Sequence, residues 1–185
     1  NDDWGRGGVE EFSRDLSAAG VKTAAKEYFD HGATDFYTLL TKLRASGADA
    51  VFVAAETQDG SILVKQIKEL GLKMKVFGVG SWATPDFIKL AGPAAEGIYA
   101  AVPYASTYES PRNVEFVKNY TQAYKEPPGK YGNAGYNAPN IMMDAIQRAG
   151  STDAEKIRGA LHKTDYDAPN RKYKFTDKGQ AYGFS

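Results

Sequence analysis

The stretch ADAVFVAA, residues 48–55, restricts the fold more than any other part of the chain. It is almost continuously apolar, which is typical of a parallel strand buried on both faces. Two further short apolar runs, VFGV and GIYAAVPYA, follow it, and helical patterns separate the three. Because parallel strands are joined by crossover helices, this β-α repeat predicts a parallel, doubly wound α/β sheet over residues 1–103. A further strand is expected over residues 21–29.

Apolar spacing also predicts where the helices of the chain begin and end. In the first part, helices are expected over residues 9–19, from a Thr34 cap to Leu43, over residues 63–70 and over residues 85–90. From Tyr104 onward helices follow one another without intervening strands, starting at Ser110-Pro111, near Tyr136, and behind a Thr152/Glu155 capping box. These later helices have apolar stripes, but the sequence offers no obvious strands to form a sheet on which the stripes could pack. The tail, residues 173–184, predicts one strand-turn element, so the second lobe is expected to be incomplete.

Composition excludes several classes of function. Lys plus Arg equals Asp plus Glu at 23 each, and this balance argues against a nucleic-acid partner. No apolar run approaches the roughly 20 residues that cross a bilayer. There is no cysteine, so disulfides and thiolate metal sites are absent. The chain begins at Asn1 with no signal sequence before it, and we interpret it as a fragment or a processed chain.

The loop VFGVGSWATP is the first candidate site. Open α/β sheets bind ligands at the carboxyl ends of their strands, and this glycine-containing loop follows a predicted strand. Gly80 offers bare backbone, Ser81 a hydroxyl and Trp82 a flat aromatic ring. Thr84 and Pro85 are suited to the N-cap and first position of the next helix. We therefore expect part of a small-molecule site at this loop.

Motifs that would indicate an enzyme are weak or missing. GVGSWA matches the dinucleotide pattern G-x-G-x-x-G/A, but its helix begins after the glycines rather than within them. His31 and His162 have no further histidine or paired carboxylate at metal-ligand spacing. No G-x-S-x-G nucleophile elbow occurs. The sequence therefore predicts a protein that is not an enzyme and holds neither a metal nor another cofactor.

Five further side chains are candidates with alternative roles. Trp4, at the mouth of a strand-to-helix loop, either fastens the helix to the sheet or faces a ligand. Glu56 follows ADAVFVAA, where a carboxylate is usually solvated but can bind an ammonium group through charge-assisted hydrogen bonds. Tyr131, Asn133 and Tyr136 lie in the polar stretch KYGNAGYNA, interpreted as a loop before a helix. They either pack or reach a ligand.

Several stretches together resemble one known family. NDDWGRGG, GATDFYTLLTKLRASGADAVFV, LVKQIKELGLK, AGPAAEGIYAAVPY and YNAPNIMMDAIQRAGS resemble the type I periplasmic binding proteins of the leucine/isoleucine/valine-binding family. The likeness covers essentially all 185 residues in order and spacing. It implies two α/β lobes, joined by three crossover segments, that close on a small-molecule ligand and present it to the membrane permease of an ABC importer. It also implies a periplasmic, or lipid-anchored extracytoplasmic, location.

The resemblance also assigns parts of the chain to lobes. It implies that residues 1–103 are the second lobe, that residues 104–165 are a hinge crossover with helices of an incomplete first lobe, and that residues 166–185 return to the hinge and second lobe. The family's N-terminal segment and final strand have no counterpart. Two alternatives stay open. The chain is a fragment without ligand binding of its own, which would dimerise or exchange strands to cover apolar faces, or it is the ectodomain of a receptor with this fold.

The resemblance carries over to individual site residues. Trp4 matches an aromatic that touches the ligand in relatives, and Glu56 matches a contacting tyrosine of leucine-type binders. Tyr131, Asn133 and the loop before Tyr136 correspond to a first-lobe contact region. Gly80 departs from the pattern, because amino-acid binders have there a glutamate that pairs with the ligand ammonium. An unpaired ammonium in a closed cleft costs several kcal/mol. We therefore expect an aromatic or other small carboxylate or, second, an amino acid whose ammonium pairs with Glu56.

Overall fold

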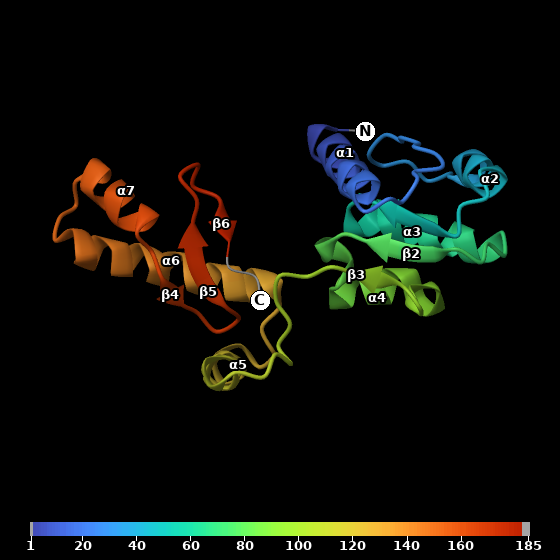
Figure 1. Cartoon of the computed structure of the whole chain (residues 1–185). Coiled ribbons are helices and arrows are strands. Elements are labelled where there is room, and N and C mark those ends of the chain that lie inside the picture. The colour runs from blue at the N-terminus through green and yellow to red at the C-terminus, as the bar shows by residue number, and fades with distance from the viewer. Residues whose placement is uncertain (1, 183–185) are drawn as a thin grey trace. The chain divides into compact units, whose positions relative to one another are not determined.

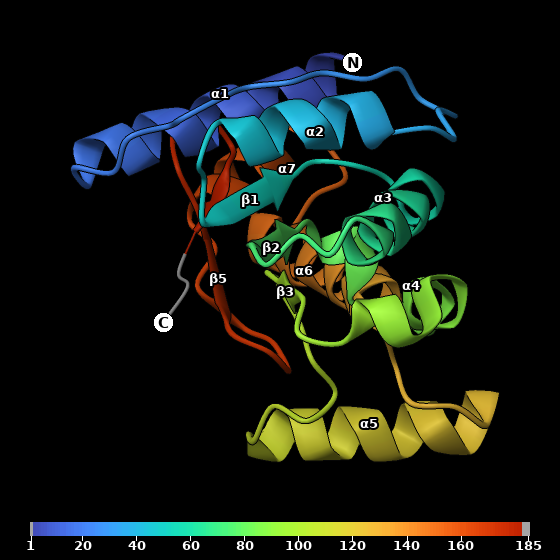
Figure 2. The same cartoon turned by 90° about the vertical axis from the view of Figure 1, so that its right-hand side faces the viewer.

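The computed structural model describes residues 2–182, so Asn1 and the end of the predicted tail, residues 183–184, lie outside the described residues. The chain divides into two compact units, unit 1 up to Val102 and unit 2 from Pro103. Figures 1 and 2 label the helices and strands of both units, and each unit is described by itself.

Unit 1 is a parallel sheet with helices on both faces. Its strands have the order β1-β2-β3, and Val51 pairs with Val76 while Phe77 pairs with Tyr99. The predicted parallel α/β sheet is therefore confirmed. The elements of unit 1 in chain order are α1 (Asp3–Ala18), α2 (Tyr37–Ala45), β1 (Ala50–Val53), α3 (Thr57–Glu69), β2 (Lys75–Gly78), a 3-10 turn (Gly80–Trp82), α4 (Pro85–Ala91), a second 3-10 turn (Gly92–Ala95) and β3 (Tyr99–Ala100).

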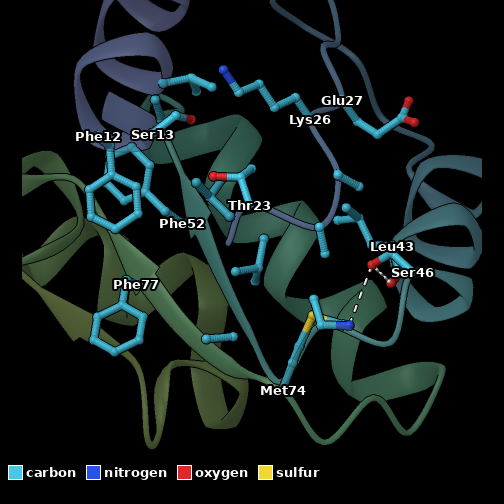
Figure 3. A pocket seen from close by; sticks show the side chains of 18 of the residues that line it. Phe12, Ser13, Thr23, Lys26, Glu27, Leu43, Ser46, Phe52, Met74 and Phe77 are labelled. Carbon is cyan, nitrogen blue, oxygen red and sulfur yellow. Dashed lines mark hydrogen bonds between the residues drawn. The ribbon is translucent and has the colours of Figure 1, made fainter. Parts of the chain in front are cut away.

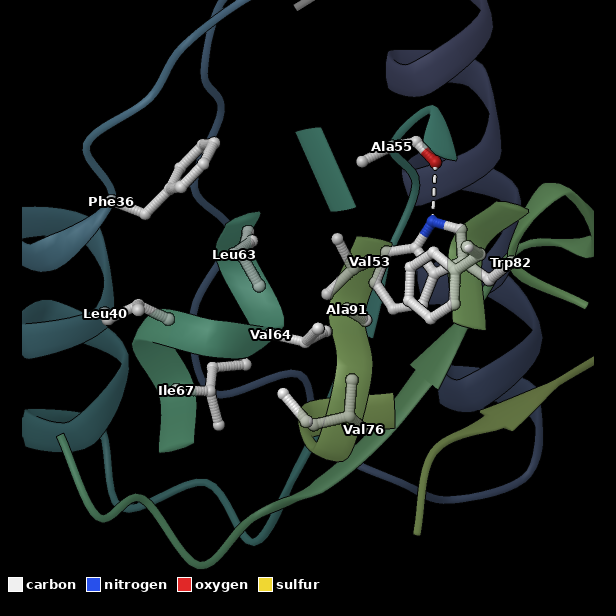
Figure 4. Packing of buried hydrophobic residues seen from close by; sticks show 12 residues of the cluster. Phe36, Leu40, Val53, Ala55, Leu63, Val64, Ile67, Val76, Trp82 and Ala91 are labelled. Carbon is white, nitrogen blue, oxygen red and sulfur yellow. Dashed lines mark hydrogen bonds between the residues drawn. The ribbon is translucent and has the colours of Figure 1, made fainter. Parts of the chain in front are cut away.

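The core of unit 1 lies between one face of this sheet and helices α3 and α4. Figure 4 shows β1 and β2 side chains meeting α3 residues such as Val64 and Ile67. Because side chains alternate along a strand, Phe52 points to the opposite face, where Phe12 of α1 stacks on it at 4.2 Å between ring centroids. Figures 1 and 2 accordingly show α1 on one side of the strands and α4 on the other.

Two local expectations for unit 1 are wrong. Residues 21–29 are extended but form no strand, because no described strand lies beside them to complete a ladder. Helix α2 begins at Tyr37 rather than behind Thr34, and its N-cap Phe36 makes no side-chain cap. Phe36 is buried in the core, and its N–H donates to the Gln66 side chain at 2.7 Å. Burial of this ring thus accompanies the start of the helix, where the Asp35 carboxylate accepts from the Tyr37 N–H at 3.0 Å.

The last apolar run also forms less strand than expected. Of GIYAAVPYA only Tyr99–Ala100 pairs, as strand β3. The predicted helix behind Thr84 is confirmed as α4, with Pro85 at its first turn and the Thr84 hydroxyl accepting from the Phe87 N–H at 3.3 Å.

Unit 2 contains three helices and a small antiparallel sheet of order β4-β5-β6. Ser110 caps its first helix as predicted, accepting from the Asn113 N–H. The tail folds into β5, a turn and β6, with β4 added in front of them. The elements are α5 (Pro111–Tyr124), α6 (Lys130–Ala149), α7 (Ala154–His162), β4 (Tyr166–Asp167), β5 (Lys172–Phe175) and β6 (Ala181–Tyr182).

Two helix starts in unit 2 differ from the expectation. Helix α6 begins at Lys130, directly behind its N-cap Gly129, rather than near Tyr136. It also continues through Pro139, although proline removes a backbone hydrogen bond from a helix interior. The N-cap of α7 is Asp153 rather than Thr152, because the Asp153 carboxylate accepts the Lys156 N–H at 3.0 Å.

Candidate ligand-binding site

The candidate residues of unit 1 gather where β1 and β2 end. Helix α3 starts behind the end of β1, and the turn Gly80–Trp82 starts behind the end of β2. The first turn of α1 reaches the same edge, since a Cβ built on Gly5 would lie 3.6 Å from the Ala54 carbonyl oxygen. Strand ends of this kind are where open α/β sheets bind ligands.

Two helix N-termini meet this edge with different caps. Asp2 caps α1 and accepts the Gly5 N–H at 2.7 Å. Glu56 is the N-cap of α3, but its side chain makes no cap hydrogen bond. The first-turn amides of α3 are therefore not satisfied by their own cap residue, and they carry the partial positive charge of the helix dipole. Such a helix end favours an anionic group, for instance a carboxylate.

Trp82 is part of the core. It is 2% exposed, and its indole Nε1 donates to the Ala55 carbonyl at 2.8 Å (Figure 4). Its ring stacks on Phe87 at 4.8 Å between ring centroids. The ring also fills the space over Gly60 and Gly78. Its packing role is clear from the structure, and its contact with a ligand stays a prediction.

The turn that carries Gly80 and Ser81 is held by two hydroxyl donors. The Ser81 carbonyl accepts from Thr57 Oγ1 at 3.2 Å and from Thr84 Oγ1 at 3.0 Å. The Ser81 hydroxyl itself is buried and has no hydrogen-bond partner among the described residues. A buried polar group without a partner costs about 1–3 kcal/mol. Ser81 Oγ is thus a polar atom of this edge whose hydrogen-bonding capacity is unused.

Trp4 and Glu56 are both exposed at this edge. Trp4, in the first turn of α1, exposes 54% of its side chain. Glu56 is exposed, and the described residues offer its carboxylate no hydrogen bond or ion pair. Of the predicted unit 1 residues, Trp4, Glu56, Gly80 and Ser81 therefore lie on loops or first turns at one edge of the sheet, whereas the Trp82 ring lies beneath it.

The predicted unit 2 residues lie in the first two turns of α6 and not in a loop before it. Tyr131 is 71% exposed, with the Lys130 ammonium over its ring. Asn133 is 2% exposed, and its Oδ1 accepts from Asn137 Nδ2 at 3.0 Å. Tyr136 is partly exposed and packs on Phe116. Because Asn133 points into the unit while Tyr131 points to solvent, the three side chains do not form one surface.

Sequence reasoning missed one polar pair in unit 1. His31 Nδ1 lies 2.7 Å from Oδ2 of Asp59, whose side chain is buried in the first turn of α3. Both Asp59 oxygens also accept from the Gly32 N–H at 3.3 Å. The pair fastens the loop after residue 29 to α3. The sequence signal that could have indicated this pair is Asp59 in the first turn of a predicted helix, together with the His31-Gly32 turn upstream.

The described residues 2–182 contain no cluster of three or more His, Cys, Asp or Glu side chains able to hold a metal ion. Within the same range, no helix combines the length and the apolar character that crossing a membrane requires.

Comparisons of the sequence and of the structure with known proteins agree on one family. A leucine-, isoleucine-, valine-, threonine- and alanine-binding protein of Pseudomonas aeruginosa is 27% identical over 181 residues, covering 98% of this chain and 48% of that protein. A leucine-binding protein of Thermotoga maritima superposes with a TM-score of 0.90 at 23% identity, covering 98% of this chain and 52% of its own. A solute-binding protein of R. palustris, in complex with benzoate, gives a TM-score of 0.80 at 20% identity, covering 95% of this chain and 49% of its own.

The chain spans about half the length of the relatives that it matches. The resemblance drawn from the sequence is confirmed, both by these relatives and by a family profile described as "Periplasmic binding protein", which matches residues 1–183. Because that match extends over nearly the whole sequence, the chain belongs to the periplasmic binding protein family.

Proposed function

We propose that the whole protein is an extracytoplasmic solute-binding protein that captures a small carboxylate and delivers it to the permease of an ABC importer. The observation that carries this proposal is the family match over residues 1–183. Relatives are named as binding proteins for amino acids, and one neighbour holds benzoate. The proposed role is binding without catalysis, in which the ligand stabilises one conformation of the protein by contacting it more strongly.

The strand-end edge of unit 1 supports a ligand that bears a carboxylate. The α3 N-terminus favours an anion and lacks a side-chain cap, and Ser81 Oγ has an unused hydrogen bond. Gly80 supplies no charge for an ammonium group. The exposed carboxylate of Glu56 is then available at this edge to pair with one. We accordingly rank an aromatic or other small carboxylate first and an amino acid that uses Glu56 second.

Calorimetric titration of the full-length protein with benzoate and with leucine tests this order. Both ligands present a carboxylate, but only leucine has an ammonium group that needs a negative partner. We expect heat from binding of the aromatic acid, at equal or higher affinity than for leucine. Tight leucine binding with no heat from any aromatic acid would reverse the order. No binding heat from either ligand would contradict the proposal that the ligand is a small carboxylate.

A Glu56→Gln variant separates the two ligand classes. If Glu56 pairs with an ammonium group, neutralising it removes a charge-assisted hydrogen bond worth about 1.5–3 kcal/mol and weakens amino-acid binding by roughly tenfold or more. Binding of an aromatic acid should stay unchanged or strengthen. Glu96→Gln, an exposed glutamate ahead of β3, is the matched control. Equal amino-acid affinity in both variants would exclude Glu56 from the site.

The second candidate is a partial chain that binds no ligand by itself. It is favoured by the fact that the chain spans only about half of its relatives, and by exposed apolar side chains in both units, among them Phe77, Tyr99, Val114 and Met143. Such surfaces promote self-association. Light scattering of the 185-residue chain is then expected to show a dimer or larger species. A well-behaved monomer would count against this candidate.

A further inference from the structure

Unit 1 and unit 2 each contain a cavity, and the two cavities differ in chemistry. The cavity of unit 1 measures about 650 Å³ and is lined mainly by apolar side chains, among them Phe12 and Phe52 (Figure 3). The cavity of unit 2 measures about 400 Å³ and combines aromatic rings with charged groups. Pockets of about 300–1,000 Å³ with a few convergent polar groups are typical of small-molecule sites. The unit 2 cavity is therefore the one whose lining can select a ligand by its charge.

This cavity, which we call the α5–α6 pocket, lies between helix α5, the start of α6 and strand β4. Helix α5 contributes residues at the spacing i, i+3, i+4 and i+7, which share one face of a helix. The lining residues include Arg112, Glu115, Phe116, Asn119, Tyr136 and Tyr166. All of them belong to unit 2, so the pocket is formed within that unit.

Three aromatic rings surround the pocket. Phe116 is buried, and Tyr136 packs on it at 4.7 Å between ring centroids. Tyr136 stays partly exposed and Tyr166 is half-buried, so both rings keep surface that a ligand can contact. Burial raises the pKa of the Tyr166 phenol above its ordinary value, which keeps this ring neutral. Neutral aromatic rings attract cations to their faces.

Glu115 supplies the net charge of the pocket. The guanidinium of Arg112 is held by Asp167, because its Nε lies 3.2 Å from the Asp167 carboxylate and its Nη1 donates to the Asp167 carbonyl at 2.7 Å. Among the described residues, the Glu115 carboxylate has no hydrogen bond and no ion pair. Since the charge of Arg112 is compensated, a negative charge remains beside the aromatic rings.

We propose that the α5–α6 pocket binds a small organic cation of the quaternary-ammonium class. Its alkyl groups contact Phe116, Tyr136 and Tyr166, and Glu115 faces its positive charge. Aromatic rings recognise such cations through the attraction of the charge to the ring face. Glu115 would repel an anion, and a neutral ligand would desolvate this carboxylate without giving it a partner. The site goes beyond the carboxylate binding proposed for unit 1.

Choline chloride is the probe for this site in the 185-residue chain. Its matched control is the alcohol in which a carbon atom replaces the choline nitrogen, because the two compounds share a shape and differ in charge. Both are titrated at constant ionic strength, with sodium chloride as the blank, and the amide chemical shifts of residues 112–119 are followed by NMR. Cation–π contacts at partly exposed rings are weak, so a dissociation constant of about 1–10 mM is expected.

Choline is expected to shift these amides saturably, whereas the neutral alcohol should bind at least about fivefold more weakly. Equal binding of the two compounds would overturn the proposal, because the pocket would then not recognise charge. The same holds if choline gives no saturation below about 50 mM, or if the sodium chloride blank reproduces the shifts.

Substitutions separate the carboxylate from the rings. Glu115→Gln should weaken choline binding by about two- to fivefold, because one partly exposed ion pair is lost. Tyr136→Leu should weaken it to a similar degree, while Tyr136→Phe keeps the ring and the affinity. Glu126→Gln changes an exposed glutamate that does not line the pocket, and it should bind choline as the parent chain does. If Glu115→Gln and Glu126→Gln bind choline equally well, Glu115 does not face a cation and the proposal fails.

Discussion

Gly78→Ala is expected to destabilise unit 1 by about 3 kcal/mol, the upper end of what overfilling a packed core typically costs. A Cβ at Gly78 would lie 2.1 Å from Cε3 and 2.4 Å from Cδ2 of the Trp82 ring, far inside contact distance. The ring cannot move aside easily, because its Nε1 is bonded to the Ala55 carbonyl and its face is stacked on Phe87. The glycine cannot move either, since Gly78 pairs with strands on both sides.

Urea unfolding, followed by the fluorescence of Trp82, measures this loss. The chain has two tryptophans, so a Trp4→Phe background leaves the Trp82 ring as the reporter of unit 1. Gly7→Ala is the matched control, because nothing lies within 4 Å of a Cβ there and the residue is inside helix α1 of the same unit. That variant should be more stable by about 0.5–1 kcal/mol.

A second glycine gives an independent check of the same packing. A Cβ at Gly60 would lie 2.4 Å from Cε2 of Trp82, so Gly60→Ala should destabilise unit 1 to a similar degree. Adding Trp82→Leu to Gly78→Ala should recover part of the loss, because the smaller side chain removes the clash; this coupling is what a double-mutant cycle isolates. Trp82→Leu removes the fluorescent reporter, so this cycle is followed by hydrogen exchange of the α3 amides. If Gly78→Ala behaves like Gly7→Ala, the ring does not occupy the position that the structure gives it.

Local pattern was enough to predict most of unit 1. The apolar run around β1, the stripe of α3 and the Thr84-Pro85 start of α4 are each determined by residues that are neighbours in sequence. The strand expected over residues 21–29 failed for a different reason. A strand exists only through its ladder partners, and no described strand adjoins this segment. Its extended shape was predictable, whereas its pairing depends on a neighbouring strand.

The direction of the Trp82 ring was not predictable from its loop. A position at a strand end suits a ligand contact and a core contact equally well. The ring packs into the core because Gly60 and Gly78 have no side chains and leave room for it. These glycines are far apart in sequence, so the space that they leave appears only once β2 and α3 are packed together. The site residues Trp4, Glu56 and Ser81 keep their predicted place at the strand ends, and their contact with a ligand stays a prediction.

In unit 2, helix α6 starts earlier than its sequence indicates, because tertiary burial outweighs weak local propensity. Its first turns contain two glycines and several polar residues, which favour a loop. The helix nevertheless buries one row of side chains at intervals of four, Asn133, Asn137, Ile141 and Ala145. This spacing is the helical signal in the sequence, but asparagines at two of the four positions conceal it from a search for apolar residues.

Asn137→Ala is expected to destabilise unit 2 by about 2–4 kcal/mol. Asn137 is 2% exposed, and its Nδ2 donates to Asn133 Oδ1 at 3.0 Å and to Asn170 Oδ1 at 3.1 Å. Truncation leaves these two acceptors buried without that donor and opens a cavity, and the two effects add. The network also ties the tail to the first residue of the unit, because Asn170 Nδ2 donates to the Pro103 carbonyl at 3.1 Å.

Hydrogen exchange of the α6 amides measures the loss, since both tryptophans lie in unit 1 and do not report on unit 2. Asn119→Ala, at an exposed position of α5, is the control and should stay within about 0.5 kcal/mol of the parent chain. The same experiment on Asn133→Ala separates its two roles. A residue of the buried network loses protection in α6 as Asn137→Ala does, whereas a residue that serves only as a ligand contact keeps it. Because Asn133 is as buried as Asn137 and hydrogen-bonded to it, we expect Asn133→Ala to lose protection in α6. Unchanged exchange in α6 would contradict this structural role and leave ligand contact as the role of Asn133.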